Sequence, residues 1–375
     1  MQAITYQFIT IRNMNRQRAN RTFDKDYELC KHNVELKVIC FNVDFFLDVG
    51  DLEGNYFEIT VRNLKRVQVD RRLSLARVSD PSEIVEESFV DCLDSHVIRM
   101  VERVEKYGFI NFYGEQRIGS PGTRAEVGVR GFEIGLSMLK QDFSGAIELL
   151  MEGKKYRESS EHTRRVRQAW RDSGGNPSAT LKAFRGADIM PRERAVLKGM
   201  NRYPNNPLES IRFISYSMRM FYINAYQSFI FNQAASRRIK LFGAKVIKGD
   251  LYFGMNTDKD YRGNVKLVDL NEVPPIEITQ VVLPLPGYDV KYPENQIGQL
   301  YRDLLEKDNV KFEKKSIPES TAKGSYRKLI VRPGTIRADI VSSNAACTSL
   351  KLSFQLPKGS YATMLLRELM LTTSM

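Results

Sequence analysis

Cysteine and histidine are scarce in this sequence. The 375 residues include four cysteines and three histidines. No Cys-x-x-Cys spacing occurs, so the cysteines predict neither a zinc site nor a disulfide framework, and they favour a reducing compartment. The three histidines lie far apart in the sequence, which disfavours a histidine-based metal centre. We therefore predict a protein without a bound metal that resides inside the cell, in the nucleus or the cytoplasm.

Long apolar runs are missing as well. The longest uncharged stretch, Met220–Ser236, contains two Asn and two Gln and is too short and too polar to span a bilayer. The first residues contain no apolar core of the kind that a secretion signal needs. The sequence thus predicts neither a membrane span nor secretion.

Positive charge is abundant. The chain has 57 Lys and Arg against 45 Asp and Glu, which gives a net charge of +12 and a pI near 9.4. This balance favours a polyanionic partner, with RNA or DNA ahead of a membrane surface. A basic protein without such a partner remains the alternative. The length and the apolar content of 42% allow two folded domains.

The stretch Phe109–Gly119 is the most informative part of the chain. A helix-period pattern runs from Phe89 to Val104 and stops at Gly108. Two apolar residues then lead to an Asn, two aromatic residues and a Gly-Glu-Gln-Arg turn. Aromatic rings stack on bases, an Asn amide can pair with a base edge, and Arg binds phosphate. Taken alone, the stretch fits a core strand-to-turn segment better than a binding loop.

The same stretch resembles the hallmark Asn-(Phe/Tyr)-(Phe/Tyr)-Gly-x-Gln-Arg-Phe-Gly of the TruD-type pseudouridine synthases, with Ile118 where the family has Phe. Other blocks resemble the family in the same order along the chain: Ala3–Gln7, Gly54–Asn63, Pro191–Pro207, Ala225–Asn232, Val281–Pro293 and Leu350–Met370. The resemblance implies an α+β fold. A catalytic domain with a mixed, largely antiparallel sheet would comprise residues 1–131 and 331–375, and a helix-rich α/β TRUD domain, residues 132–330, would be inserted in it.

The resemblance also implies a function and a site. Enzymes of this family isomerise uridine to pseudouridine in RNA without a cofactor, so the implied partner is tRNA, or else small nuclear or messenger RNA, bound by a monomer. Tyr113 would stack on the uracil and Asn111 would support its loop. Gln116 and Arg117 would shape that loop or contact phosphate.

Three further residues are implied near the reacting carboxylate. Thr5 and Gln7 would flank the family's catalytic Asp, and Arg367 would be its charge partner. The family pattern is Gly-x-Lys-Asp-(Lys/Arg)-x-Ala-x-Thr-x-Gln. Matching it to Ala3, Thr5 and Gln7 places the Asp one position before Met1, so no residue of this sequence is assigned as catalytic.

Three interpretations follow from this placement. The chain can be the main part of an active synthase whose start lies upstream. It can be an RNA-binding or RNA-folding protein that keeps the scaffold without catalysis. It can also be a decayed chain of marginal stability, because losing the opening strands would leave sheet edges unpaired.

Periodicity predicts the main elements. Alternating apolar residues predict strands over 3–10, 34–40, 55–64 and 350–356. Helical patterns are predicted over 13–21, 89–106, 295–308 and 361–371, and residues 132–200 are expected to be rich in helices. A further helix carries the apolar stripe Met218, Tyr222, Ala225 and Phe229. Prolines make 281–293 a rigid extended loop. Tyr226, Gln227 and Asn232 are expected to be buried polar groups with hydrogen bonds inside the fold.

Overall fold

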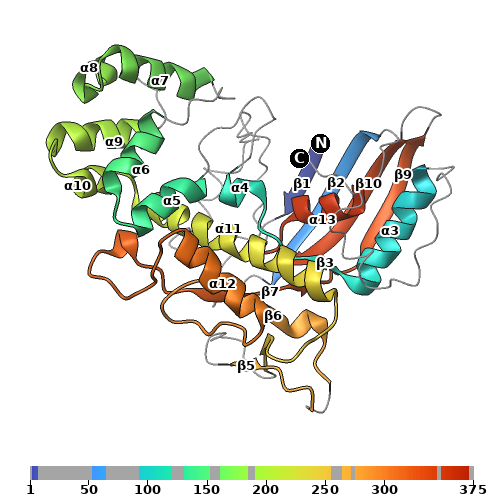
Figure 1. The fold of residues 1–375 in the computed structure, drawn as a ribbon. Helices are drawn as coiled ribbons and strands as arrows, with labels where there is room; N and C mark the ends of the chain where they lie inside the picture. The colour runs from blue at the N-terminus through green and yellow to red at the C-terminus, as the bar shows by residue number, and fades with distance from the viewer. Residues whose placement is uncertain are drawn as a thin grey trace, which may run out of the picture. The chain divides into compact units, whose positions relative to one another are not determined.

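The structure is a computed structural model. It describes residues 2–6, 53–64, 93–119, 131–152, 161–184, 191–254, 264–271, 275–343 and 348–370. The chain divides into two compact units, one of Met1–Arg66 with Pro333–Gly359 and one of Val67–Arg332 with Ser360–Met375. Their limits differ from the predicted boundaries at 131/132 and 330/331, and the domain assignment stays a prediction. The described elements are helices and antiparallel sheets, as expected of an α+β protein (Figure 1).

The first unit contains a four-stranded antiparallel sheet. Its strands stand in the order β1-β2-β10-β9. They are β1 (Gln2–Tyr6), β2 (Gly54–Leu64), β9 (Ile336–Ser343) and β10 (Thr348–Pro357). Ile59 pairs with Leu352, and both are buried, as are Leu350, Phe354 and Leu356. The predicted alternation over 55–64 and 350–356 is therefore confirmed.

Strand β2 begins at a glycine that the packing against β10 requires. A Cβ on Gly54 would lie 2.2 Å from the carbonyl oxygen of Leu356, so only glycine lets β2 begin against β10. The strand predicted over 3–10 is present as β1 up to Tyr6. Its remainder, including Gln7, and the elements predicted over 13–21 and 34–40 lie outside the described residues.

A second four-stranded antiparallel sheet belongs to the other unit, in the order β5-β4-β6-β7. Its strands are β4 (Leu251–Phe253), β5 (Val265–Leu267), β6 (Val281–Leu285) and β7 (Ser325–Lys328). The prediction of a loop over 281–293 is wrong for its first five residues, which form the buried strand β6. Pro284 has no N–H to donate, but the described pairing of β6 with β4 stops at Val282, so at Pro284 the strand pairs only with β7. Its carbonyl oxygen accepts a 2.7 Å hydrogen bond from the Tyr301 hydroxyl.

Residues 131–212 confirm the predicted helix-rich segment. The helices are α5 (Gly131–Leu139), α6 (Phe143–Met151), α7 (Glu161–Asp172), α8 (Pro177–Lys182), α9 (Pro191–Arg202) and α10 (Pro207–Arg212). Two of them start with the same local signal, an Asn cap followed by proline. The side chains of Asn176 and Asn206 accept hydrogen bonds from the backbone of Ala179 and Glu209.

Helix α11 (Tyr216–Phe242) is the longest described element, with 27 residues. Helices α5 and α12 (Gln296–Lys307) and strand β6 pack on it, so it is buried well beyond the predicted stripe. A Cβ on Gly135 of α5 would lie 1.9 Å from the Tyr222 carbonyl oxygen, which shows how closely α5 crosses α11. The helix predicted over 295–308 is confirmed as α12, and the Asn295 side chain caps its start.

Two more helices pack together in this unit, α3 (Leu93–Tyr107) and α13 (Ala362–Met370). Helix α3 ends as predicted, because Gly108 has a φ of 80°, in the left-handed region that glycine favours. Within the described ranges, no helix has both the length and the apolar character needed to cross a bilayer.

A buried ion pair fixes the C-terminal end of α11. Arg238 and Asp250 are both 0% exposed, with Arg238 Nη2 2.6 Å and Nε 3.1 Å from the two carboxylate oxygens. Arg238 Nη1 also donates to the carbonyl of Gly243, and Asp250 accepts from the side chain of Asn295. The pair is thus surrounded by hydrogen bonds, which a desolvated charge pair requires.

We predict that Asp250→Ala destabilises the chain by about 3–5 kcal/mol, because it leaves the Arg238 charge buried without its partner. Asp289→Ala is the matched control. Its ion pair with Lys323 is half exposed, and such pairs contribute about 0.2–1 kcal/mol. Urea unfolding of both variants measures the difference, and equal losses would contradict the prediction.

A second charge cluster joins α10 and α11 to the short 3-10 helix η3 (Pro318–Ser320). Glu319 is buried, and its carboxylate accepts from Arg212 at 3.2 Å and lies 3.2 Å from Arg219 Nη2. Burial alone would raise the pKa of Glu319, but the hydrogen bond from Arg212 and the charges of both arginines outweigh it. The pKa therefore lies below the ordinary 4.5.

A carboxylate whose pKa is lowered by folding stabilises the fold above its unfolded pKa and loses that contribution as the pH falls through the lowered value. We therefore predict that Glu319→Gln costs about 1–3 kcal/mol at pH 7. The cost should shrink as the pH falls below 4.5. Denaturant unfolding at several pH values measures it, with the exposed Glu294→Gln as control; a pH-independent cost would refute the assignment.

Candidate active site

The loop Asn111–Gly114 is positioned by a short strand pair. Strand β3 (Phe109–Ile110) follows Gly108 and pairs with β8 (Ile330–Val331). A Cβ on Gly108 would lie 2.5 Å from the Val331 carbonyl oxygen, so glycine is required both for the turn and for this approach. The N–H of Asn111 extends the pairing by donating to Leu329 at 2.9 Å.

Asn111 ties this loop to strand β7. Its side-chain Nδ2 donates to the Lys328 carbonyl at 3.1 Å, and its Oδ1 accepts from Arg327 Nη2 at 2.6 Å. Its backbone oxygen accepts from Arg327 Nε at 2.7 Å. The Asn111 side chain is buried, and its amide is engaged on both sides by the protein. Its geometry is that of a residue that holds the loop in place.

Arg327 is the centre of the arrangement. It is buried, and besides Asn111 it donates to the carbonyl of Phe112. Its guanidinium carbon lies 4.0 Å from the centroid of the Tyr113 ring and 5.8 Å from those of Phe231 and Tyr361. Burial lowers the pKa of Arg327 below the ordinary value of an arginine, while Tyr113 and Tyr361 favour its charged form. Arginine stays protonated at neutral pH, so a cation lies against the Tyr113 ring.

Tyr113 is held from several sides. Its backbone N–H donates to Asn232 Oδ1 at 2.8 Å, and Asn232 Nδ2 donates to its carbonyl at 2.9 Å. The rings of Phe231 and Tyr361 meet it edge-on, with centroids 5.6 and 5.9 Å away. The Tyr113 side chain nevertheless remains partly exposed. A rigid and partly accessible ring of this kind can stack on a planar ligand.

Gln116 and Arg117 lie on the next turn, α4 (Glu115–Ile118), which ends at Gly119. Gln116 is exposed, and its side chain folds back over Gly114, where a Cβ would lie 2.3 Å from Gln116 Oε1 and 3.0 Å from Tyr361 Cδ1. The Arg117 guanidinium lies 5.2 Å from the Phe221 ring centroid of α11. Among the described residues, its buried Nε has no hydrogen-bond acceptor.

Positive charge gathers beside the two tyrosines. Burial raises the pKa of the Tyr361 hydroxyl above 10, and the nearby charges of Arg117 and Arg327 act in the opposite direction. Arg117 also disfavours the charge on Arg327, because the two guanidinium groups repel one another. This part of the site can attract an anionic ligand. Among the described residues, no group of three or more His, Cys, Asp or Glu is arranged to hold a metal ion.

The structure brings five of the seven implied site residues to one part of the second unit. Asn111, Tyr113, Gln116 and Arg117 share the loop and α4, and Arg367 of α13 lies 5.5 Å from the Phe112 ring centroid. Thr5 lies in β1 of the other unit, paired with Phe57, and Gln7 lies outside the described residues.

Comparisons with known proteins identify the family. The family model described as "tRNA pseudouridine synthase D (TruD)" matches residues 1–369. The chain belongs to the TruD family of pseudouridine synthases. It is 29% identical over 393 residues to "Pseudouridylate synthase PUS7L" of Homo sapiens, covering 98% of this chain and 51% of that protein.

Two further relatives show the breadth of the TruD family. "Multisubstrate pseudouridine synthase 7" of Schizosaccharomyces pombe is 30% identical, over 88% of this chain and 50% of its own length. The crystal structure of a putative tRNA pseudouridine synthase D from Methanosarcina mazei has the same fold, with a TM-score of 0.62 and 24% identity. That match covers 86% of this chain and 70% of the archaeal one. The chain spans about half the length of the curated relatives named here.

Arg327, Asn232 and Tyr361 were not among the implied site residues. Asn232 and Tyr361 lie in blocks that resemble the family and Arg327 does not, and nothing local to any of the three pointed to Tyr113. Asn232 was expected to be satisfied inside the fold together with Tyr226 and Gln227, and this is confirmed. Tyr226 donates to Asp308 at 2.9 Å, and Gln227 donates to the Pro286 carbonyl at 2.7 Å. The partner that Asn232 holds is the backbone of Tyr113 itself.

We predict that Arg327→Lys destabilises the chain by about 1–3 kcal/mol, because a lysine cannot reproduce the planar set of hydrogen bonds or the stack on Tyr113. Arg302→Lys is the matched control, since Arg302 is exposed and bonds only locally to Gln299 among the described residues. We expect the control to stay within about 0.5 kcal/mol of the parent. Urea unfolding compares them, and an equally stable Arg327→Lys would argue against this role.

Proposed function

We propose that this chain is the TruD-type part of an RNA pseudouridine synthase that isomerises uridine to pseudouridine in tRNA. The observation that supports this most is the Tyr113 ring, which lies against the Arg327 guanidinium at 4.0 Å and is still partly exposed. Such a ring offers a fixed stacking surface to a single base. The reaction is proposed from membership of the TruD family of pseudouridine synthases.

The reaction needs a base that has left its stack. The bond between ribose C1′ and uracil N1 breaks, the uracil turns, and a bond forms between C1′ and C5. C5 loses a proton and N1 gains one, so the product is an isomer of the substrate and no electrons are exchanged. Taking a base out of a helix costs a few kcal/mol, and contacts in the pocket offset that cost. In this proposal Tyr113 stacks on the freed uracil, and Asn111, Arg327 and Asn232 are positioning residues that hold its ring.

A carboxylate is proposed as nucleophile or base. By resemblance it is an Asp that precedes the Ala3–Gln7 block, with Thr5 and Gln7 beside it. Arg117 is proposed to contact an RNA phosphate, since its guanidinium lies near Tyr361 and Arg327. Arg367 is proposed to balance the charge of the carboxylate. The experiment uses the longest form of the protein that its gene encodes, which we call the extended form, whether or not it is longer than the sequence given.

The second candidate is an RNA-binding or RNA-folding protein on the same scaffold. It is favoured by the exposed cations on the described helices, such as Arg164, Arg165 and Arg202, which can hold an RNA backbone without any catalytic group. The two candidates differ in one readout. If the extended form binds tRNA but converts no uridine, the second candidate, an RNA-binding protein, is correct and the synthase proposal fails.

We predict that the extended protein forms pseudouridine in tRNA and that Tyr113→Ala lowers kcat/KM by about 5- to 150-fold, the value of one base–aromatic stack. Tyr113→Phe keeps the ring and should stay within about threefold of the parent, because the hydroxyl is not needed for stacking. Pseudouridine is mapped by carbodiimide labelling and primer extension over a time course.

Tyr288→Ala serves as control, since Tyr288 is another partly buried tyrosine of the same unit. It should leave kcat/KM unchanged. Full activity of Tyr113→Ala, or equal losses in the Phe and Ala variants, would contradict the stacking role.

A further inference from the structure

Three exposed aromatic rings lie close together on the helical part of the second unit. Tyr203 is 39% exposed, Phe213 43% and Tyr216 60%. The rings of Tyr203 and Phe213 meet edge-on with centroids 6.1 Å apart. The Arg219 guanidinium lies 5.7 Å from the Tyr216 ring centroid and donates to the carbonyl of Arg212, next to Phe213. We refer to Tyr203, Phe213 and Tyr216 as the aromatic patch.

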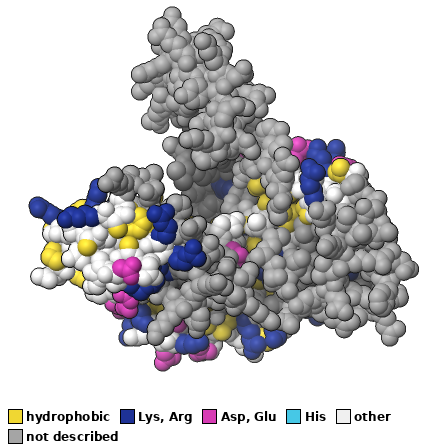
Figure 2. Space-filling view, turned by 90° about the horizontal axis from the view of Figure 1, so that it is seen from above, with side chains coloured by type: hydrophobic (Ala, Val, Ile, Leu, Met, Phe, Trp, Pro, Cys, Tyr) yellow, Lys and Arg dark blue, Asp and Glu magenta, His cyan; other side chains and the backbone are white. Residues whose placement is uncertain are grey.

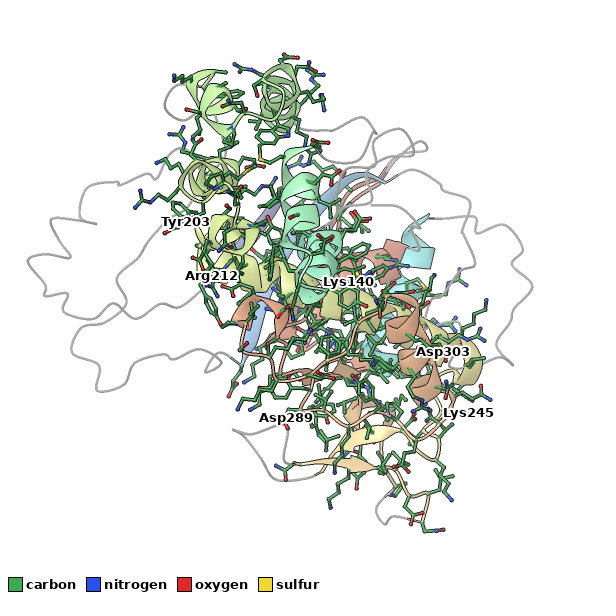
Figure 3. The ribbon with its side chains drawn as sticks, turned by 60° about the vertical axis from the view of Figure 1, so that its left-hand side comes forward. Lys140, Tyr203, Arg212, Lys245, Asp289 and Asp303 are labelled. Carbon is green, nitrogen blue, oxygen red and sulfur yellow. The ribbon has the colours of Figure 1, made fainter. Side chains whose placement is uncertain are left out.

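The aromatic patch lies on and beside α9 and α10, which pack closely against each other. A Cβ on Gly199 of α9 would lie 2.3 Å from the Ser210 carbonyl oxygen, so α9 and α10 touch backbone to backbone. The Ser210 hydroxyl bonds to the carbonyls of Tyr203 and Asn206 at 3.1 Å each. Arg212 is held by Glu209 and Glu319. The rings are therefore exposed on a hydrogen-bonded turn and not on a loose segment, and Figure 3 shows Tyr203 and Arg212 on the same outer edge.

The charge around the patch is strongly positive. Residues 161–212 contain 11 Lys and Arg against five Asp and Glu, so this segment carries half of the net charge of +12. Its exposed cations in the described residues include Arg164, Arg165, Arg171, Lys182, Lys198 and Arg202. Figure 2 shows Lys and Arg side chains, with apolar ones between them, on the left-hand part of the view, where α7 and α8 lie in Figure 1.

We propose that the aromatic patch binds unpaired nucleotides of an RNA by stacking, while the cations of α7–α9 hold its phosphates. Exposed rings interleaved with cations are the means by which proteins bind single strands, whose bases have free faces. A duplex hides its base faces, so it can use the cations but not the rings. The site consists of residues other than those around Tyr113, and the inference rests on the proposed function because it takes RNA as the partner.

The test measures the affinity of the 375-residue chain for two labelled RNAs by fluorescence anisotropy. One is an unstructured strand of about 12 nucleotides, a length within the usual site size. The other is a duplex of the same sequence. In the triple variant Tyr203→Ala, Phe213→Ala, Tyr216→Ala, Kd for the single strand should rise at least about fivefold, the value of one lost stack, while Kd for the duplex stays within about twofold.

Three controls separate stacking from charge and folding. Leu241→Ala with Leu270→Ala removes exposed apolar side chains elsewhere and should change neither Kd. Tyr203→Phe with Tyr216→Phe keeps the rings and should bind like the parent. Arg164→Gln, Arg165→Gln and Arg171→Gln together should weaken both RNAs and lower the salt slope of single-strand binding by about 2, at about 0.7 per lost phosphate contact.

Two outcomes overturn the inference. If the triple variant binds the single strand as tightly as the parent, the rings serve another kind of partner, such as a protein. If it loses both RNAs equally, the rings act through the fold. If the triple variant keeps the parent Kd while the extended form makes pseudouridine in tRNA, this inference alone fails. If the extended form binds tRNA but converts no uridine, the proposed synthase function fails.

Discussion

The guanidinium of Arg327 under the Tyr113 ring is the interaction on which the candidate site depends. A buried cation is tolerable only when its donors are satisfied, and here the acceptors are the backbone and side-chain oxygens of the Asn111–Phe112 loop. The contacts of Arg327 therefore compensate its own charge, hold the Asn111–Phe112 loop and fix the position of the Tyr113 ring. Because several contacts hold this loop and ring, the Tyr113 ring keeps its orientation although it is partly exposed.

Helix α11 supplies the second half of that support. It provides Phe231 to the edge of the Tyr113 ring and Asn232 to its backbone, one residue further along. The helix can do so because it is itself fixed at several points, by Gln227 on Pro286 and by the buried pair of Arg238 with Asp250. Gln227, Arg238 and Asp250 are buried with partners and Asn232 is partly buried with its own, so burial of the helix on several sides is compatible with its polar sequence.

The arginines divide into two kinds that composition cannot separate. Arg238 and Arg327 are buried and bind protein oxygens, and they contribute to the fold. Arg164, Arg165 and Arg202 are exposed on the helices that carry half of the net charge. The net positive charge that first suggested a polyanionic partner thus comes from arginines with different roles. Only the exposed arginines are available to an RNA backbone.

The sequence by itself determined the family, through its motifs. It also determined the end of α3 at Gly108, the helix α12 and the alternation of β10, because each of these depends on neighbours within a few residues. It also placed Tyr113 and Asn111 correctly in one loop. The tertiary structure alone decided that Arg327 and Asn232, which lie 216 and 119 residues from their partners in the chain, meet that loop, and that Pro284 sits inside a strand. Such contacts depend on how strands and helices pack, and no local pattern encodes that packing.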